Sequence, residues 1–231
     1  MIRRSLALLA ISFATVPAAA QVGHSPETSP FEDLRGRQAL TFATGVLATG
    51  GDPAGVGPRS GAVVSARYEI LLTGPLWVQT RLTYAPKLER TVRDPFFTGT
   101  ENFDGTSYRP LVIGDVGFGL NLSGNKSWRG IVPQFHSAIG FVSGGTKKFD
   151  VGGYRFGTKF AVNYGLGVRV VTGSEWEWHG DLTHQFWKYR YPDSYRNDDS
   201  ANPEPLLPGP SLEAWKGNLQ VSFGVSRFFF R

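Results

Sequence analysis

Few side chains in this sequence are of the types that usually carry out catalysis or bind metal ions. The 231 residues include no cysteine and only four histidines, at positions 24, 136, 179 and 184. The missing thiols exclude disulfides and thiolate metal sites. His179 and Asp181 stand two residues apart. On a β-strand that spacing puts both on one face, where they could begin either a metal site or a hydrogen-bonded network.

A metal site would need a further ligand, for which His136 has the right chemistry. His136 falls on a predicted strand that is separated from the strand of His179 by one other, a distance of roughly 9–10 Å at ~4.8 Å per strand. This separation favours a structural polar network over a metal site. A Ser-His-Asp hydrolase is compatible with the composition, but no G-x-S-x-G motif supports it. We therefore expect no metal, no cofactor and no catalytic residue.

The elements that hold these residues are predicted to be strands. Eight segments alternate large apolar residues with small or polar ones, the period of two that is typical of a strand. No segment has a sustained 3.6-residue stripe, so helix is at most a minor element. The segments cover residues 38–46, 62–72, 76–84, 112–122, 131–141, 159–170, 176–186 and 218–225.

The connections between these segments alternate strictly between short and long. Three are short and turn-like, at 73–75, 123–126 and 172–174, and four are long, at about 48–60, 86–109, 143–154 and 191–215. An up-and-down antiparallel barrel with tight turns at one end and extended loops at the other produces this alternation. The predicted fold is all-β: an eight-stranded antiparallel up-and-down transmembrane β-barrel, with both chain ends on the turn side.

The face opposite the large apolar residues is polar, and we expect it to line the barrel interior. A soluble carrier of the lipocalin kind would instead turn its apolar side inward. Eight strands leave an interior just wide enough for side chains to fill it. The predicted structural network consists of Arg67, Glu69, Arg81, Asp115, His136, Arg169, Glu177 and Asp181. Five of these, at similar depth, are expected to form one hydrogen-bonded cluster: Arg67, Arg81, Asp115, His136 and Asp181.

The aromatic residues fall near strand ends, which predicts two membrane-interface belts. A soluble core would place several of them near strand centres. The belt beside the short turns would contain Trp77, Trp128, Trp176, Trp178 and Phe228 to Phe230. The belt near the long loops would contain Trp187, Trp215, Tyr84, Tyr108, Tyr154, Tyr189, Tyr191 and Tyr195.

The first twenty residues read as a secretory signal peptide. Arg3 and Arg4 precede an apolar run that stops at Pro17, and Ala18-x-Ala20 forms a small-residue cleavage site. Cleavage would lower the net charge from +5 to +3. The remaining basic residues are scattered, so a nucleic-acid partner is not expected. We assign residues 1–20 to the signal peptide, 21–36 to a periplasmic N-terminal lead-in and 37–231 to the barrel.

The leader, the eight alternating strands and the last strand, which runs from Leu219 into Phe228 to Phe230, resemble the small outer-membrane β-barrels of the OmpA, OmpX and OmpW-like group. The peptidoglycan-binding domain of longer OmpA-type proteins is not expected. The resemblance implies an outer-membrane location, contact with outer-membrane lipid and lipopolysaccharide, insertion by the barrel-assembly machinery, and a monomer. The chain departs from the group in one respect, since Arg231 follows the terminal Phe230.

Some barrels of this type modify lipid A, but the patterns of those enzymes are missing here. The deacylase carries a His-x-Ser pair, whereas this chain offers His136-Ser137 and His184-Gln185-Phe186. The palmitoyl transferase places a His on its outer loops, and no long loop here contains one. We expect no enzymatic activity. Strict alternation would point His184 at lipid, so we predict a β-bulge near Thr183 that redirects it.

The predicted function is a structural or surface-interaction role through the long extracellular loops. A filled eight-stranded barrel leaves little continuous lumen. Two alternatives stay open: a narrow conduit or lateral route for small or apolar solutes, which the OmpW-like resemblance implies, and a lipid A-modifying enzyme. Basic residues near the outer rim could contact lipopolysaccharide phosphates. They are Lys87, Arg90, Lys147, Lys148, Arg155, Lys188 and Arg190.

Overall fold

The computed structural model describes residues 29–34, 36–94, 103–145, 152–172, 175–196, 206–207 and 209–229. All of its secondary structure lies in one compact unit, residues 31–231. The predicted signal peptide and most of the predicted lead-in fall outside the described residues. In the part of the chain that is described, no helix has the length and apolar character needed to cross a membrane.

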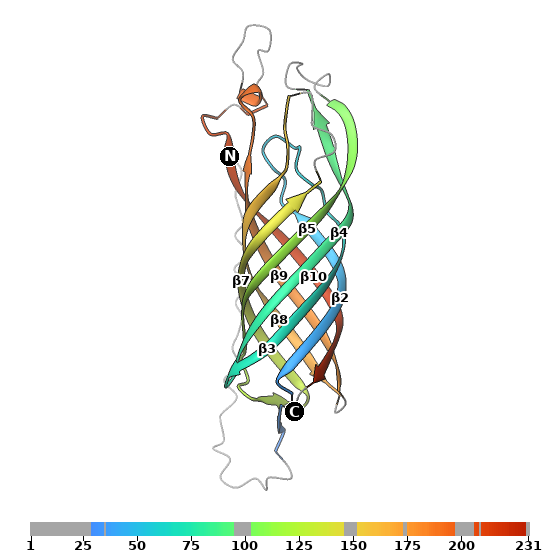
Figure 1. Ribbon diagram of the computed structural model, residues 1–231, viewed down its shortest axis with the longest axis vertical. Coiled ribbons are helices and arrows are strands. Elements are labelled where there is room, and N and C mark those ends of the chain that lie inside the picture. Colours follow the sequence, from blue (N-terminus) through green and yellow to red (C-terminus); the bar gives the residue numbers. More distant parts are fainter. Residues whose placement is uncertain are drawn as a thin grey trace, which may run out of the picture. The chain divides into compact units, whose positions relative to one another are not determined.

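Eight long strands pair in sequence order to form a closed antiparallel barrel (Figure 1). They are β2 (Gln38–Thr49), β3 (Gly61–Thr73), β4 (Leu76–Arg93), β5 (Phe103–Asn121), β7 (Ile131–Gly144), β8 (Thr158–Val171), β9 (Trp176–Arg190) and β10 (Glu213–Phe229). The last strand, β10, pairs with both β9 and β2, which closes the sheet on itself. Closure leaves no strand of the barrel with a free edge along its whole length, as a membrane-spanning sheet requires. The predicted eight-stranded fold is confirmed.

Two short strands and one helical turn complete the described structure. At the end of the barrel with the short connections, here the turn end, β1 (Phe31–Asp33) pairs antiparallel with β6 (Lys126–Trp128). At the opposite, loop end, the 3-10 helix η3 covers Asp193–Arg196. The sequence pattern did not predict these three elements, because each is too short to show a period.

The second long connection is shorter than predicted. The prediction placed a loop at 86–109, but β4 continues to Arg93 and β5 begins at Phe103. The prediction failed because β4 contains a β-bulge, which interrupts the alternation. The three residue steps from Ala85 to Leu88 on β4 pair with the two steps from Leu111 to Arg109 on β5. Below the bulge the odd-numbered side chains of β4 face inward, and above it Leu88 and Arg90 do. The bulge therefore reverses the alternation, and the strand pattern in the sequence stops there.

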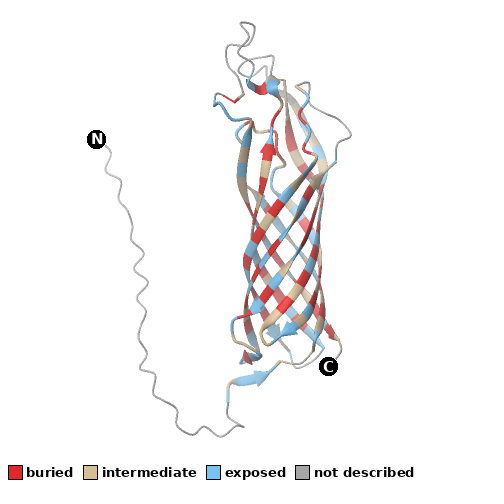
Figure 2. Ribbon diagram, turned by 60° about the vertical axis from the view of Figure 1, so that its left-hand side comes forward, coloured by how far each residue is buried: buried red, intermediate tan, exposed pale blue. Residues whose placement is uncertain are grey.

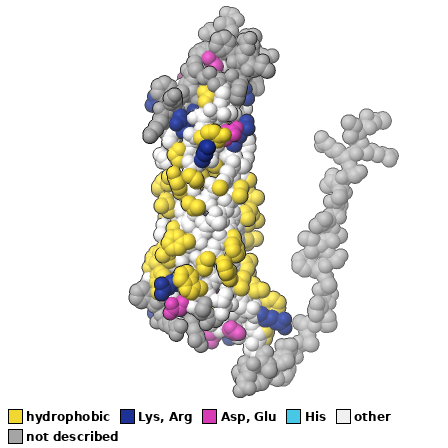
Figure 3. All heavy atoms as spheres, turned by 90° about the vertical axis from the view of Figure 1, so that its right-hand side faces the viewer, with side chains coloured by type: hydrophobic (Ala, Val, Ile, Leu, Met, Phe, Trp, Pro, Cys, Tyr) yellow, Lys and Arg dark blue, Asp and Glu magenta, His cyan; other side chains and the backbone are white. Residues whose placement is uncertain are grey.

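The two faces of the sheet differ as predicted for a membrane-spanning barrel. Large apolar side chains on the outer face are 37–61% exposed, whereas the polar side chains on the inner face are buried (Figure 2). In the space-filling view, hydrophobic side chains cover the barrel wall and charged ones gather towards its two ends (Figure 3). Hydrocarbon favours this outer surface, and side chains that satisfy one another favour this interior.

The predicted aromatic belts are only partly correct. Seven side chains assigned to them are buried inside the barrel or its cap: Trp77, Trp187, Tyr154, Tyr189, Tyr191, Tyr195 and Phe228. The exposed members are Trp128, Trp176 and Trp178 at the turn end, and Trp215, Tyr84 and Tyr108 nearer the loop end. Trp77, Trp187 and Tyr189 share the inward parity of the polar residues on their own strands. Alternation therefore predicts their direction better than their position at a strand end does.

His184 lies on the outer face, and the predicted β-bulge near Thr183 is wrong. The strand β9 pairs with β8 from Glu177 to Trp187, and with β10 along its whole length, without a shift in register. The alternation therefore continues through Thr183, which is buried, to His184, which is partly exposed among lipid-facing neighbours.

Close approach between neighbouring strands explains part of the glycine content. A Cβ atom added at Gly140 would lie 2.0 Å from the carbonyl oxygen of Gly114, on the adjacent strand β5. At Gly180, on β9, an added Cβ would meet no atom within 4 Å. Gly140 is therefore required by packing, whereas Gly180 is not.

We predict that Gly140→Ala destabilises the barrel, because the backbone must shift to admit the methyl group. The expected loss in the free energy of unfolding is about 1–3 kcal/mol, the usual cost of overpacking. Denaturant unfolding of the purified protein in lipid vesicles measures it, with Gly180→Ala as the matched control. Equal stability of the two variants would contradict the argument.

Candidate functional site

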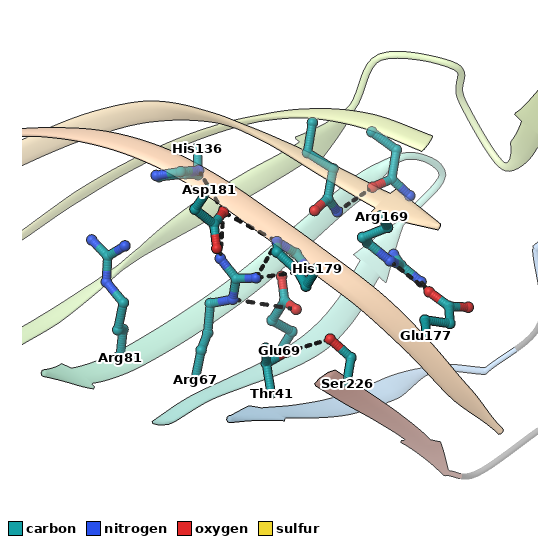
Figure 4. A network of polar contacts seen from close by, with 12 residues as sticks. Thr41, Arg67, Glu69, Arg81, His136, Arg169, Glu177, His179, Asp181 and Ser226 are labelled. Carbon is teal, nitrogen blue, oxygen red and sulfur yellow. Dashed lines mark hydrogen bonds and ion pairs between the residues drawn. The ribbon is translucent and has the colours of Figure 1, made fainter. Parts of the chain in front are cut away.

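Buried ion pairs fill the middle of the lumen (Figure 4). Arg67 of β3 lies with Nη1 3.1 Å from Oδ1 of Asp181 on β9, and its Nε lies 3.5 Å from Glu69. Arg81 of β4 donates from Nε to Oδ2 of Asp115 on β5 at 3.1 Å. All five side chains are at most 8% exposed. Two guanidinium groups and three carboxylates thus share a space without bulk water, where each charge needs its partner.

Thr183 and His136 connect these pairs. Arg81 donates from Nη1 to the Thr183 hydroxyl at 3.1 Å, and His136 Nε2 lies 3.0 Å from the same oxygen. His136 Nδ1 lies 3.9 Å from Asp181. The structure therefore brings together Arg67, Arg81, Asp115, His136 and Asp181, the five residues placed at one depth from the sequence. Thr183 was not in the predicted set, although its parity puts it on the same face.

His179 also belongs to this mid-lumen network and was not in the predicted set. Both of its ring nitrogens contact Arg67 Nη2, and Nε2 lies 3.1 Å from Asp181. The spacing of His179 and Asp181 had indicated a shared face, and they meet there. Across the residues that the structure describes, no three His, Asp or Glu side chains converge as a metal ion would require.

Arg169 and Glu177 form a separate pair at the turn end. Arg169 donates from Nε to Glu177 Oε2 at 2.9 Å, and its guanidinium lies 4.3 Å from the ring centroid of Phe228. Trp77 packs edge-on against Phe228 with centroids 6.2 Å apart. Buried Ala39 completes this group. The turn end of the lumen is therefore filled by one ion pair and a small apolar cluster.

An aromatic cap closes the loop end of the lumen. Its core is three stacked rings, Tyr154, Tyr191 and Tyr195, with centroids 5.8–6.0 Å apart. Tyr189 stacks on Tyr191 at 6.2 Å. Trp187 and Phe156 lie below and are buried with them. These residues come from the end of β9, from η3 and from the segment before β8, so the cap joins the connection between β9 and β10 to the one between β7 and β8.

Asp52 fixes a third connection, the one between β2 and β3, to this cap. Its carboxylate accepts a hydrogen bond from the Tyr191 hydroxyl at 2.9 Å and one from the backbone N–H of Gly57 at 2.9 Å. Burial and the nearby Asp52 carboxylate raise the pKa of Tyr191, so its hydroxyl stays protonated and donates. Arg90 lies over the Tyr154 ring, 5.8 Å from its centroid.

A polar cleft lies outside the cap, between the loop after β2 and the end of β4. Its volume is about 570 Å³. Arg59 spans it, with Nη1 3.1 Å from Glu89 and Nη2 donating to Thr91 at 3.2 Å. The other lining residues are Thr49, Gly51, Asp52, Gly55, Gly57, Pro58, Ser60 and Arg93. Apart from Pro58, the lining residues are charged, hydroxyl-bearing or glycine, and no aromatic residue is among them.

The predicted lipopolysaccharide contacts lie in different environments. Lys87 is exposed, 4.3 Å from the ring centroid of Tyr108, and Arg155 is exposed. Lys188 and Arg190 face outward, and both pair with Glu213. Lys147 and Lys148 fall outside the described residues. Arg90 must be removed from the set, because the bulge in β4 turns it inward and it is only 6% exposed.

Comparison with known proteins places this fold. No family model and no curated protein matches the chain. Among solved structures, Neisserial surface protein A is 9% identical with a TM-score of 0.50, covering 87% of this chain and 98% of its own. The outer membrane protein OprG of Pseudomonas aeruginosa is 10% identical with a TM-score of 0.51, covering 86% and 99%. The chain has the fold of the small eight-stranded outer-membrane β-barrels. In outer-membrane barrels the short turns are periplasmic and the long loops extracellular. The aromatic cap and the polar cleft both lie at the long-loop end of this barrel.

We predict that Arg81→Ala lowers barrel stability by about 3–5 kcal/mol, because it leaves the Asp115 carboxylate buried without its partner. The double variant Arg81→Ala/Asp115→Ala removes both charges and should recover part of the loss. Thermal and denaturant unfolding in detergent or vesicles measure both variants. An unchanged melting temperature for Arg81→Ala would show that the pair carries no stability.

We predict that Tyr191→Phe loosens the loop at 50–60 without unfolding the barrel. The variant removes one hydrogen bond to Asp52, a contribution of about 0.5–1.5 kcal/mol. Hydrogen exchange at Gly55 to Gly57 should become faster. Tyr108→Phe, at an exposed outer position, is the control and should leave these amides unchanged. If Tyr191→Phe also leaves them unchanged, the Asp52 contact does not hold the loop.

Proposed function

We propose that this chain is an outer-membrane barrel that acts as a closed scaffold for binding at its extracellular surface. The observation that carries the proposal is the aromatic cap, which fills the extracellular mouth and, with Asp52, joins three connections of the chain. Recognition concentrates on loops that a rigid scaffold holds in place. The polar cleft beside the cap supplies a formed surface for a ligand.

Three filled layers in the lumen argue against a water-filled conduit. The cap, the mid-lumen network and the cluster around Trp77 and Phe228 lie one below another between the two ends.

We propose further that residues 1–20 are cleaved on export, that the barrel-assembly machinery inserts the chain, and that the protein works as a monomer in contact with lipopolysaccharide. We propose no enzymatic role; lipid A extracted from cells that express the chain should keep its mass.

A second candidate function, lateral passage of an amphipathic solute, is favoured by one feature of the wall. The strand β5 pairs with β7 only as far as Leu111 and Gly144, and above Pro110, whose carbonyl accepts from the Gly145 N–H at 3.3 Å, the segment from Phe103 to Arg109 pairs with β4 alone. A mostly apolar pocket, whose lining includes Arg90 and Arg109, lies beside the point where the pairing of β5 with β7 ends. Its volume is about 20 Å³, room for roughly one water molecule. Solute passage would therefore require the wall to move, and we rank it second.

The nature of the cleft suggests a polar, hydroxyl-rich ligand, so the test uses saccharides. We expect proteoliposomes of the full chain to bind members of a glycan array that includes neutral, sialylated and sulfated glycans. Arg59→Ala should weaken that binding about tenfold, since hydrogen bonds from charged groups contribute roughly 1.5–3 kcal/mol. Lys126→Ala, a basic residue at the periplasmic turns, is the matched control. No glycan binding, or full binding by Arg59→Ala, would contradict the proposal.

Planar-bilayer recording tests the closed lumen separately. We expect no discrete conductance steps from the wild-type protein. Regular steps would contradict the scaffold proposal and favour the conduit.

A further inference from the structure

His184 is a polar residue on the lipid-facing wall of the barrel. Its neighbours on that face are exposed and mainly apolar: Leu166, Leu182, Leu219 and Tyr164. Hydrocarbon supplies no hydrogen-bond partner, so polar groups at this depth reduce stability. The register of β9 is regular, so neither a bulge nor a slip explains why the side chain points outward.

Three neighbours hold the imidazole ring in one place. The Tyr164 hydroxyl lies 3.3 Å from Nδ1, with the two rings edge to face at 5.7 Å. Phe186 packs beside both, with its centroid 4.2 Å from that of His184 and 5.8 Å from that of Tyr164. The ring leans over Gly217 of β10, where an added Cβ would lie 2.4 Å from Nε2. We call Tyr164, His184, Phe186 and Gly217 the outer-wall site.

The contact with Tyr164 engages Nδ1 and leaves the other ring nitrogen, Nε2, for a ligand. A neutral imidazole has one N–H and one acceptor nitrogen. Nε2 donates when Nδ1 accepts from the Tyr164 hydroxyl, and it accepts when Nδ1 donates. Nε2 has no hydrogen bond to any described residue. It is therefore a polar atom at the lipid-facing surface without a partner among the described residues.

Charged residues lie above this site on the same face. Lys188 and Arg190 both contact Glu213, which leaves one positive charge in excess. Trp215 is paired with Lys188 and is 53% exposed, as is typical of a membrane interface. Lys188 lies four positions after His184 on β9. At a rise of ~3.4 Å per residue and a strand tilt of ~40°, the two residues differ in membrane depth by about 10 Å.

We propose that the outer-wall site binds one lipid of the outer leaflet, a phosphorylated glycolipid of the lipid A type. A phosphate would lie near Lys188 and Arg190, and a hydroxyl group at the acyl linkages, which can both donate and accept, would hydrogen-bond His184 Nε2. The two protein groups lie at different depths on one face, with the charged residues nearer the loop end, in the order of headgroup and acyl linkage in such a lipid. The inference rests on the proposed outer-membrane location.

Native mass spectrometry of the full chain, released from detergent micelles that contain lipid A or phosphatidylglycerol, tests the site. The wild-type protein should retain lipid A in preference to phosphatidylglycerol. His184→Phe should lower the retained lipid A about fivefold, the effect of one hydrogen bond. Gly217→Val, which displaces the His184 ring without removing it, should also lower the retained lipid A. Tyr68→Phe removes an outward hydroxyl elsewhere on the wall and should change nothing.

Each alternative outcome has a defined meaning. Wild-type retention by His184→Phe, or equal retention of the two lipids by the wild type, would overturn the proposal. His184→Phe places an apolar ring in hydrocarbon and should still fold, which its migration on a gel before and after heating verifies. Membrane fractionation and the glycan assay test the proposed function alone, so its failure is distinguishable from failure of this site.

Discussion

The narrow interior of an eight-stranded barrel is the constraint on which the rest of this structure depends. Closure of β10 onto β2 pairs the backbone groups of the sheet but leaves a lumen that only side chains can fill. Each inward side chain must therefore pack against the others in a confined space. They are arranged in layers, with ions in the middle and aromatic or apolar groups towards both ends.

The same constraint links the lumen to the extracellular surface. Trp187 and Tyr189 continue the inward face of β9 beyond its polar middle, and Tyr191 and Tyr195 extend that column into the loops. The loops thus pack on an extension of the barrel interior instead of on one another alone. This arrangement explains how a cleft can hold its form at the end of long connections, with Asp52 as the link to the loop after β2.

Alternation in the sequence was enough to predict the barrel and the side of the wall on which most residues lie. It placed Arg67, Arg81 and Asp115 correctly on one face, because a period of two survives wherever strands stay in register. It failed above Ala85, where one extra residue reverses the parity and buries Arg90. That bulge depends on pairing with β5 and has no signature in a single strand.

Other errors arose where the alternation along a strand was given less weight than a residue's position at a strand end or the cost of exposing it to lipid. Trp77 and Trp187 were assigned to interface belts because they stand at strand ends, although parity already put them inside. A bulge was invoked for His184 because a lipid-facing imidazole is unfavourable, and the ladder shows none. The cap could not be derived at all, since stacking of Tyr154 on Tyr191 depends on how loops fold in three dimensions.

The distribution of charge around the lumen bears on how the barrel can open and close during assembly. The mid-lumen ions come from β3, β4, β5 and β9, with His136 from β7. The inward residues of β2 and those of β10 from Asn218 to Phe228 are uncharged, and the contact between Thr41 and Ser226 joins two hydroxyl groups. The two strands at this seam are therefore joined by backbone hydrogen bonds and uncharged side chains. The ion pair of Arg67 and Asp181 reaches across the seam from β3 to β9, the strands on either side of it, so this pair can form only once the sheet has closed.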